Sequence, residues 1–217
     1  MGSGTSGKQD TKVSVTKVTA AAKVDTRELI LAAADKVFGD IGYDAASTRE
    51  IAESCGINKA LIHYHFKNKD GLLASVLDRY YERLGGKIAD ALGGEGTLRF
   101  KLLALVDVYA DFLGQNLRFC RIVQREASGG KHADKVRDRM VPIFEFGRAA
   151  IVTEFPASAS GDMAAEQLMI SVYGMIVTWF TYGDVLAPLL DASPTSKRQL
   201  AARKRHVRRV AILLMDE

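Results

Sequence analysis

The sequence predicts an all-α protein, on three observations. Its 217 residues are 47% hydrophobic, which is enough to bury the core of one large or two small domains. It contains only four prolines. Long stretches repeat apolar residues three and four positions apart, which is the spacing of an amphipathic helix and not of a strand. Counting these stretches predicts about nine helices and no strand.

Residues 1–24 precede the first helical pattern. They mix Gly, Ser, Thr and Lys without a helical period, so we predict a flexible basic arm, and the opening MGSGTSG is typical of an expression leader. Such an arm is suited to contact the backbone or minor groove of DNA. A tail without any role is the simpler interpretation, because short basic tails are common.

The first two predicted helices begin at recognisable signals. An apolar stripe that includes Ile30 and Phe38 starts near Thr26, and Gly42 ends it as C-terminal glycines commonly do. The run Ser47-Thr48-Arg49-Glu50 then has the form of a capping box, in which the serine accepts from the amide three residues on. We therefore expect a short second helix to begin there.

A tight turn separates this second helix from a third. Gly56 lies where the chain must turn sharply, and Asn58 can cap a helix that runs to about Phe66. Two short helices around a tight turn are a candidate helix-turn-helix. Residues 25–71 are therefore predicted to form an N-terminal three-helix DNA-binding domain.

The remainder of the chain, residues 72–217, is predicted to form a larger helical domain. A long amphipathic helix after Lys69 joins the two domains, and Gly93–Gly96 forms a loop behind it. Further apolar stripes follow at Thr97–Leu113, Asn116–Ala127, Ala133–Phe155, Asp162–Leu190 and Ser196–Met215.

The segment Ser47–Leu73, STREIAESCGINKALIHYHFKNKDGLL, resembles the DNA-binding signature of the tetracycline-repressor (TetR) family. It has the threonine at the start of the second helix, the Ile-Ala pair, the turn glycine, the Tyr-His-Phe end of the third helix and the following Lys-x-Lys-x-x-Leu-Leu. The resemblance is specific over about residues 26–75 and only architectural beyond them. It implies a ligand-responsive repressor that binds a near-palindromic operator as a homodimer.

Candidate DNA contacts lie on the second, third and fourth helices. By spacing, Lys59, Ala60, His63 and Tyr64 share the face that a recognition helix presents to the major groove. The resemblance implies that the second-helix start contacts backbone and a base edge, that the tyrosine contacts backbone or base, and that the fourth-helix lysine contacts a phosphate. The full predicted set is Thr48, Arg49, Asn58, Lys59, Ala60, His63, Tyr64 and Lys69. Leu61 and His63 depart from the family pattern, which puts the family's base preference in doubt.

The sequence predicts no metal site, no cofactor and no enzyme. His63 and His65 are two positions apart on a helix and point about 200° apart, and Cys55 and Cys120 lie in no metal or disulfide spacing. No phosphate loop after a strand, HExxH or nucleophile elbow is present. An all-helical enzyme is therefore the weaker alternative to a DNA-binding regulator.

Dimerisation is expected through the last two helices. The segment Asp162–Leu190 is apolar around too much of its circumference for one buried face. In the TetR family the final two helices of each subunit pair across a two-fold axis, and the last helix offers an apolar stripe at Ala201, Val207, Val210, Ala211 and Leu214. Its basic run Arg203–Arg209 is interpreted as a solvated face with ion pairs to Glu145 or Asp184, and alternatively as an anion or partner site.

A ligand pocket is expected between the middle helices. Aromatic residues and methionines at helical spacing suit a hydrophobic small-molecule effector, although the same pattern is typical of a filled core. Arg121 and Arg125, on an otherwise apolar helix, either orient a ligand or pair with other charges. The alternative is a dimeric DNA-binding regulator without an effector. The predicted pocket residues are Tyr109, Phe112, Phe119, Phe144, Met169, Tyr173 and Trp179.

No segment reaches the roughly 20 consecutive apolar residues of a membrane-spanning helix. Met1–Lys23 lacks the apolar core of a signal peptide. We therefore expect no membrane association and a cytoplasmic protein.

Overall fold

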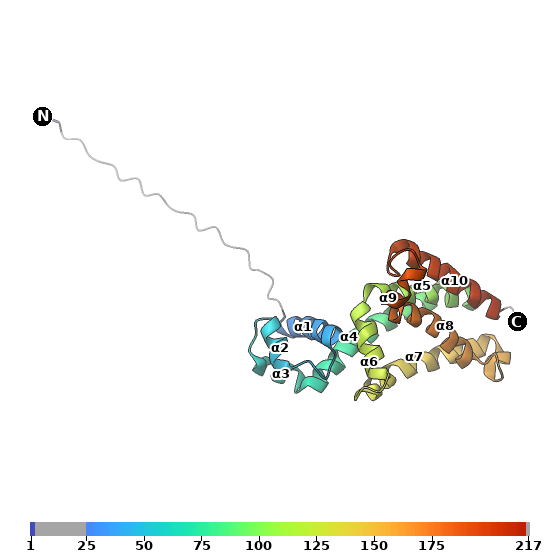
Figure 1. Ribbon diagram of the computed structural model, residues 1–217, viewed down its shortest axis with the longest axis horizontal. Helices are drawn as coiled ribbons and strands as arrows, with labels where there is room; N and C mark the ends of the chain where they lie inside the picture. The colour runs from blue at the N-terminus through green and yellow to red at the C-terminus, as the bar shows by residue number, and fades with distance from the viewer. Residues whose placement is uncertain (3–24, 216–217) are drawn as a thin grey trace.

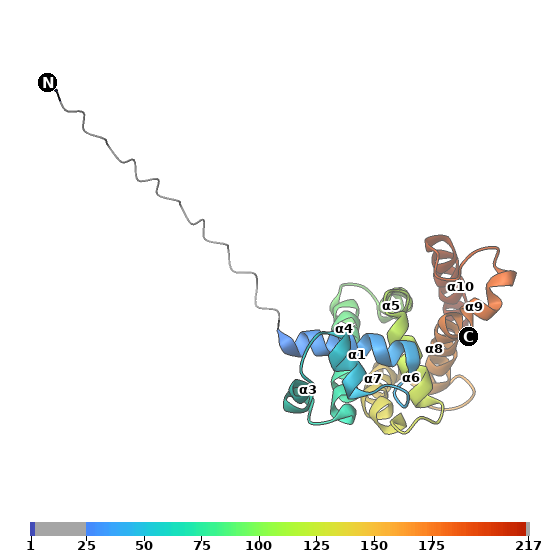
Figure 2. The same cartoon turned by 60° about the vertical axis from the view of Figure 1, so that its left-hand side comes forward.

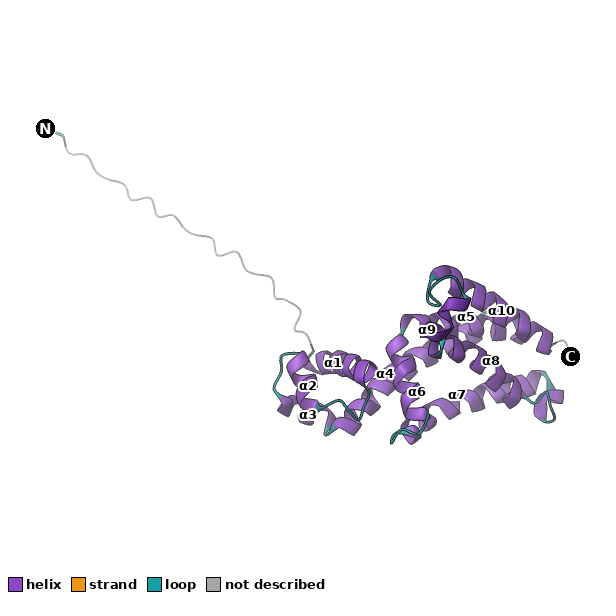
Figure 3. Ribbon diagram, viewed as in Figure 1, coloured by secondary structure: helices purple, strands orange, loops and turns teal. Residues whose placement is uncertain are grey.

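The computed structural model describes residues 1–2 and 25–215, so the expected arm at 3–24 lies outside the described residues. The described part is all helical, as the sequence predicts, with ten α-helices, two short 3-10 helices and no strand (Figures 1 and 3). The α-helices are α1 Thr26–Ile41, α2 Thr48–Ser54, α3 Lys59–Phe66, α4 Lys69–Gly93, α5 Leu98–Gln115, α6 Leu117–Ala127, α7 Ala133–Glu154, α8 Ala165–Thr181, α9 Gly183–Leu186 and α10 Lys197–Met215. The 3-10 helices are η1 Pro156–Ala159 and η2 Ala187–Leu189.

The helices gather into two groups joined by α4. Helices α1 to α3 lie at one end of the molecule, and the 25-residue α4 leads from them into α5 to α10 (Figure 1). Seen after a 60° turn, α8 to α10 lie together on the side away from α3 (Figure 2). One continuous core cluster runs from Ile30 and Ile51 through Leu77 of α4 to Phe112 and Val207. The two groups are therefore packed on each other and not merely tethered.

Side-chain caps fix the starts of the three helices that carry the predicted DNA contacts. The Ser47 hydroxyl accepts from the Glu50 amide at 3.0 Å, as the capping-box pattern predicts. The Asn58 side chain accepts from the Ala60 amide at 2.9 Å, and Asn68 accepts from the Gly71 amide at 2.8 Å. Each cap satisfies an amide that would otherwise have no partner in the first turn.

The expected continuous segment Asp162–Leu190 is wrong. Helix α8 begins only at Ala165, and the chain bends by 74° between α8 and the segment Gly183–Leu189. Gly183 is buried against Pro194, where an added Cβ would lie 3.0 Å from the proline ring. The first residue of α9 thus packs closely on the loop before α10, a contact that helical periodicity does not reveal.

No single helix of the described residues has the length and apolar character to cross a membrane; only α8 taken together with Gly183–Leu189, across their bend, meets that requirement by length and composition.

Candidate functional site

Helix α3 is held by two side chains and exposes the others. Ile62 and Phe66 are buried, at 1% and 5% exposure, and pack against the core of α1, α2 and α4. Lys59, Ala60 and His63 are exposed, and Tyr64 is 81% exposed. The face that sequence spacing assigns to the major groove is therefore free of intramolecular packing. Its contact with DNA stays a prediction.

The residues predicted to contact DNA on α2 and at the start of α3 also interact within the protein. Thr48 is half-buried, whereas Arg49 is exposed and pairs with Glu53 one turn on, at 2.8 Å. Asn58 uses its side-chain oxygen to cap α3, which leaves its amide N–H groups free. Because the Arg49–Glu53 pair is exposed, its net contribution to stability is small, so the guanidinium can exchange it for DNA.

Lys69 is turned inward, which differs from the phosphate contact that the family resemblance implies. Its Nζ donates to the backbone carbonyls of Tyr43 and Ala46, both at 2.8 Å, and lies 4.1 Å from the centre of the Tyr43 ring. Two of its three N–H donors are thus used to fix the loop between α1 and α2 onto the start of α4. The sequence spacing alone contains no signal for this role.

The loop between α6 and α7 meets the loop between α1 and α2 and the start of α4. The Tyr43 hydroxyl donates to Asp70, and this hydrogen bond is the main cause that holds the pKa of Asp70 below its ordinary range. The His132 ring packs edge-on against the Tyr43 ring with centroids 4.2 Å apart, and its Nε2 lies 3.4 Å from Asp70. Tyr43, Asp70 and His132 therefore join the α1–α2 loop, the start of α4 and the α6–α7 loop at one junction.

Helix α6 directs three arginines at the C-terminal end of α1. Arg125 Nη1 donates to the Phe38 and Gly39 carbonyls, each at 3.3 Å, where a helix end offers partial negative charge. Arg121 lies 3.6 Å from Asp40, and Arg118 lies 3.8 Å from Asp35. Of the two interpretations that the sequence left open, Arg121 shows pairing with another charge, whereas Arg125 bonds backbone carbonyls, and neither lines the cavity described next.

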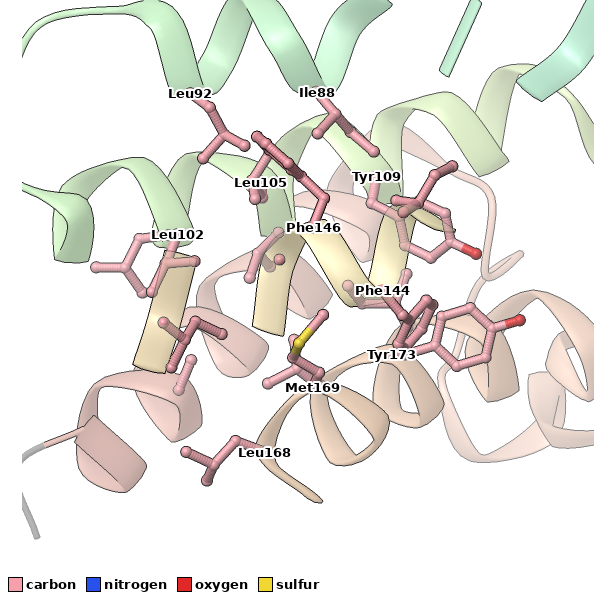
Figure 4. A pocket seen from close by; sticks show the side chains of 18 of the residues that line it. Ile88, Leu92, Leu102, Leu105, Tyr109, Phe144, Phe146, Leu168, Met169 and Tyr173 are labelled. Atoms are coloured by element: carbon pink, nitrogen blue, oxygen red, sulfur yellow. The ribbon is translucent and has the colours of Figure 1, made fainter. Parts of the chain in front are cut away.

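The larger helical group encloses a cavity of about 430 Å³. Its walls come from α4, α5, α6, α7, α8 and α10, and Figure 4 shows the side chains that point into it. Five of the predicted pocket residues line it: Tyr109, Phe119, Phe144, Met169 and Tyr173. Sequence reasoning missed the aliphatic part of the wall, which includes Ile88, Leu92, Leu102, Leu105, Ile143 and Leu168.

Phe112 and Trp179 do not line this cavity, so the prediction is corrected for both. Phe112 is 1% exposed and packs edge-on against Phe119, with ring centroids 5.7 Å apart. The Trp179 Nε1 donates to the Pro194 carbonyl at 3.1 Å, and the Arg203 guanidinium lies 5.2 Å from its ring centre. Trp179 therefore holds the loop before α10 and not a ligand.

The basic run of α10 pairs with acids other than those expected. Lys204 bonds Asp111 at 2.8 Å and Arg208 bonds Asp107 at 2.9 Å, and both acids belong to α5. Glu145 and Asp184 are not their partners. Two members of the predicted dimer stripe, Val207 and Ala211, are buried within the protomer at 0% and 8% exposure. The large apolar side chains exposed on α8, α9, η2 and α10 are instead Ile170, Val185, Leu186, Leu189 and Leu213.

Both cysteines are free, and within the described residues no group of three or more His, Cys, Asp or Glu side chains is arranged to hold a metal ion.

The packed recognition helix and the helical body behind it define a two-domain helix-turn-helix protein. Residues 30–76 match the sequence model of the family described as bacterial regulatory proteins, tetR family. This N-terminal segment of the chain is therefore similar to the region that the family model describes. The matched residues span most of α1, all of α2 and α3 and the start of α4, so they contain the exposed face described above.

Solved structures share the whole fold at low sequence identity. A fatty acid degradation regulator, FadR, from Bacillus halodurans is 18% identical, with a TM-score of 0.69 over 86% of this chain and 94% of its own. A putative fatty acid metabolism regulator from Clostridium perfringens is 20% identical, with a TM-score of 0.70 over 87% of this chain and 97% of its own. At these identities the likeness establishes the fold alone.

Curated relatives match about half of this chain. The HTH-type transcriptional activator FasR of Mycolicibacterium smegmatis is 33% identical over 99 residues, which is 46% of this chain and 45% of that protein. The probable HTH-type transcriptional regulator YttP of Bacillus subtilis is 32% identical over 108 residues, which is 49% of this chain and 52% of that protein. The chain thus spans about half the length of these relatives.

Proposed function

We propose that this protein is a sequence-specific DNA-binding transcriptional regulator, a homodimeric repressor that responds to a hydrophobic small molecule. One observation carries the proposal: α3 is anchored by Ile62 and Phe66 and leaves Lys59, His63 and Tyr64 exposed, within the segment that matches the tetR family. A helix packed in this way is suited to enter a major groove. In this proposal residues 25–71 read DNA, and residues 72–217 dimerise and sense the ligand.

Each exposed group has a defined part in DNA binding. Lys59 supplies a counter-charge for a phosphate, and Tyr64, which is 81% exposed, contacts backbone or base. Arg49, at the start of α2, has the planar fork that suits guanine. His63 has no packing contact that would prevent it from facing DNA, and its neutral ring can donate or accept.

The homodimer is proposed to form through α8 and α10. Ile170 on α8 is 56% exposed and Leu213 on α10 is 52% exposed, while Val185 of α9 reaches 74%. These helices lie at the end of the molecule away from α3 (Figure 2). Pairing there leaves both recognition helices free to read half-sites of a near-palindrome about 34–36 Å apart or somewhat more.

The cavity favours ligand sensing over a protein that only dimerises. Its volume of about 430 Å³ lies within the range of small-molecule sites, about 300–1,000 Å³. Phe119 and Val123 of α6 line it, and the same helix places Arg125 on the end of α1. A ligand that moves α6 therefore acts directly on the DNA-binding end.

The test is fluorescence anisotropy with labelled DNA fragments selected from a random pool by the purified protein, at several salt concentrations. Lys59→Ala/Tyr64→Ala should weaken binding about thirtyfold or more and reduce the salt slope by about one. Lys87→Ala/Phe100→Ala removes the same kinds of group from exposed positions on α4 and α5 and should bind as the unaltered protein does.

Both double variants should keep the free energy of unfolding within about 0.5 kcal/mol, because all four side chains are exposed. Selection of no preferred sequence, or equal loss of affinity in both variants, would refute the assignment of α3 as the reader.

A further inference from the structure

We propose that the cavity binds an elongated, uncharged molecule that carries one polar group, with that group held at the end formed by Tyr109 and Tyr173. The inference rests on the proposed function, because it names the chemical class of the effector. In this inference the two phenols position the polar group of the ligand, and they take no part in the DNA-binding surface.

The wall of the cavity excludes charge. Of the described residues, none that lines it is an acid, a lysine, an arginine or a histidine. Arginines on α7 are engaged elsewhere: Arg139 bonds Asp78 at 2.7 Å and Arg148 bonds Glu166 at 3.2 Å. An anionic headgroup would therefore lose its hydration without gaining a counter-charge, which is strongly unfavourable in apolar surroundings.

The polar side chains that line the cavity are Tyr81, Tyr109, Tyr173 and Ser158, and the Ser158 hydroxyl already donates to the Phe155 carbonyl at 2.7 Å. In Figure 4 the hydroxyls of Tyr109 and Tyr173 lie side by side at the same end of the cavity. Their rings are stacked with centroids 5.8 Å apart. Burial raises the pKa of Tyr109 well above its ordinary value of 10.0, with the nearby Tyr173 phenol adding to the effect, so it stays neutral and can donate a proton in a hydrogen bond. This pair suits a hydroxyl, ester or ketone oxygen.

The other end is hydrocarbon. Leu92, Leu102 and Leu168 lie at the opposite side of the cavity in Figure 4 and offer only methyl and methylene groups. Phe146 lines the cavity and is nevertheless 61% exposed, so the cavity reaches the surface beside it. A chain-like or flat apolar molecule fits between the mouth and the phenol pair.

The experiment uses the full chain and the neutral fluorescent probe N-phenyl-1-naphthylamine, displaced at pH 8 by 1-tetradecanol or by tetradecanoate, both below their aggregation limits. The alcohol should displace the probe at a concentration at least tenfold below that of the carboxylate. Tyr109→Phe/Tyr173→Phe should weaken the alcohol about three- to tenfold, the value of one or two neutral hydrogen bonds, and leave the probe's affinity unchanged. Tyr182→Phe, at an exposed tyrosine, is the matched control.

A cavity-filling variant locates the site. Leu105→Trp should abolish probe binding, and Gly147→Ala should weaken it, because an added Cβ would lie 2.7 Å from Met169 Cε and push that side chain into the cavity. The second variant serves if the first fails to fold by circular dichroism. Probe binding that survives a folded filling variant would overturn the assignment to the cavity.

The remaining outcomes separate the ligand class from the proposed function. Tetradecanoate binding as tightly as the alcohol, or a phenylalanine double variant without effect on the alcohol, would overturn the inference while DNA anisotropy still supports a regulator. Displacement that follows the expected order supports the ligand class even if selected DNA is not bound, in which case the proposed function alone fails.

Discussion

Replacing Tyr80 by phenylalanine tests how the DNA-binding helices are fixed to the rest of the molecule. Tyr80 of α4 is 4% exposed, and its hydroxyl donates to Asp35 of α1 at 2.5 Å. Burial, and then the hydrogen bond to Asp35, raise the pKa of Tyr80, so the hydroxyl remains a donor at all ordinary pH. Phenylalanine keeps the ring contact with Phe119, at a centroid distance of 4.8 Å, and removes only the donor.

The expected loss in the free energy of unfolding follows from the Asp35 carboxylate, which Tyr80→Phe leaves without its hydrogen-bond donor. Asp35 is 7% exposed, and the nearest cation is the Arg118 guanidinium at 3.8 Å. A hydrogen bond to a charged, buried acceptor contributes about 1.5–3 kcal/mol, so Tyr80→Phe should lower the free energy of unfolding by about 2 kcal/mol. The free energy of unfolding should decrease by about 2–3 kcal/mol per molar urea, so the urea concentration at the unfolding midpoint should fall by about 1 M.

The assay is urea titration followed by circular dichroism, at pH 7 and one fixed protein concentration. The exposed Tyr182→Phe should change the midpoint by less than a quarter of this amount. In a double-mutant cycle with Asp35→Ala, the two losses should overlap by about 1–2 kcal/mol. A loss below about 0.5 kcal/mol for Tyr80→Phe, or strict additivity in the cycle, would refute the reasoning.

Two further predictions follow from shifted pKa values. Burial raises the pKa of Cys120 to about 12, so its thiolate is scarce at pH 8, and Ellman's reagent should modify Cys55 long before Cys120. Rapid colour from a Cys55→Ser variant would contradict this. The Tyr43 hydroxyl lowers the pKa of Asp70 from its ordinary value of 3.8, so the stabilisation is complete above that value and is lost as the pH falls through the folded-state pKa. Asp70→Asn should therefore destabilise the protein in urea titrations at pH 7 and leave stability almost unchanged near pH 2; equal losses at both pH values would argue against it.

Helix starts were predictable because their signals are local. Ser47 and Asn58 cap helices by bonding amides two or three residues away, so the sequence contains both partners of each interaction. The break at Gly183 was missed, and helical periodicity gave no sign that this residue packs on Pro194 further along the chain. Local chemistry is thus visible in the sequence, and contacts between loops are not.

The candidate sites, too, could be predicted from the sequence only where the signal is local. Exposure of Lys59 and Tyr64 follows from helical spacing around the buried Ile62. Periodicity did not reveal that Lys69 turns toward the α1–α2 loop or that Trp179 faces Pro194. Helical periodicity predicts which side of a helix a side chain lies on, but not which residue it contacts. The aliphatic cavity wall had no signal at all, since leucine is equally suited to a filled core and to a cavity.

Helix α6 has the cavity on one side and α1 on the other. Phe119 and Val123 line the cavity, while Arg118, Arg121 and Arg125 contact the end of α1. Influence through such a helix is reciprocal, because coupling between two binding equilibria has one free energy. Under the proposed function, an effector that weakens operator binding tenfold must itself bind tenfold less tightly to the operator-bound protein. DNA binding therefore changes the affinity of the cavity for its ligand by the same factor as the ligand changes the affinity for DNA.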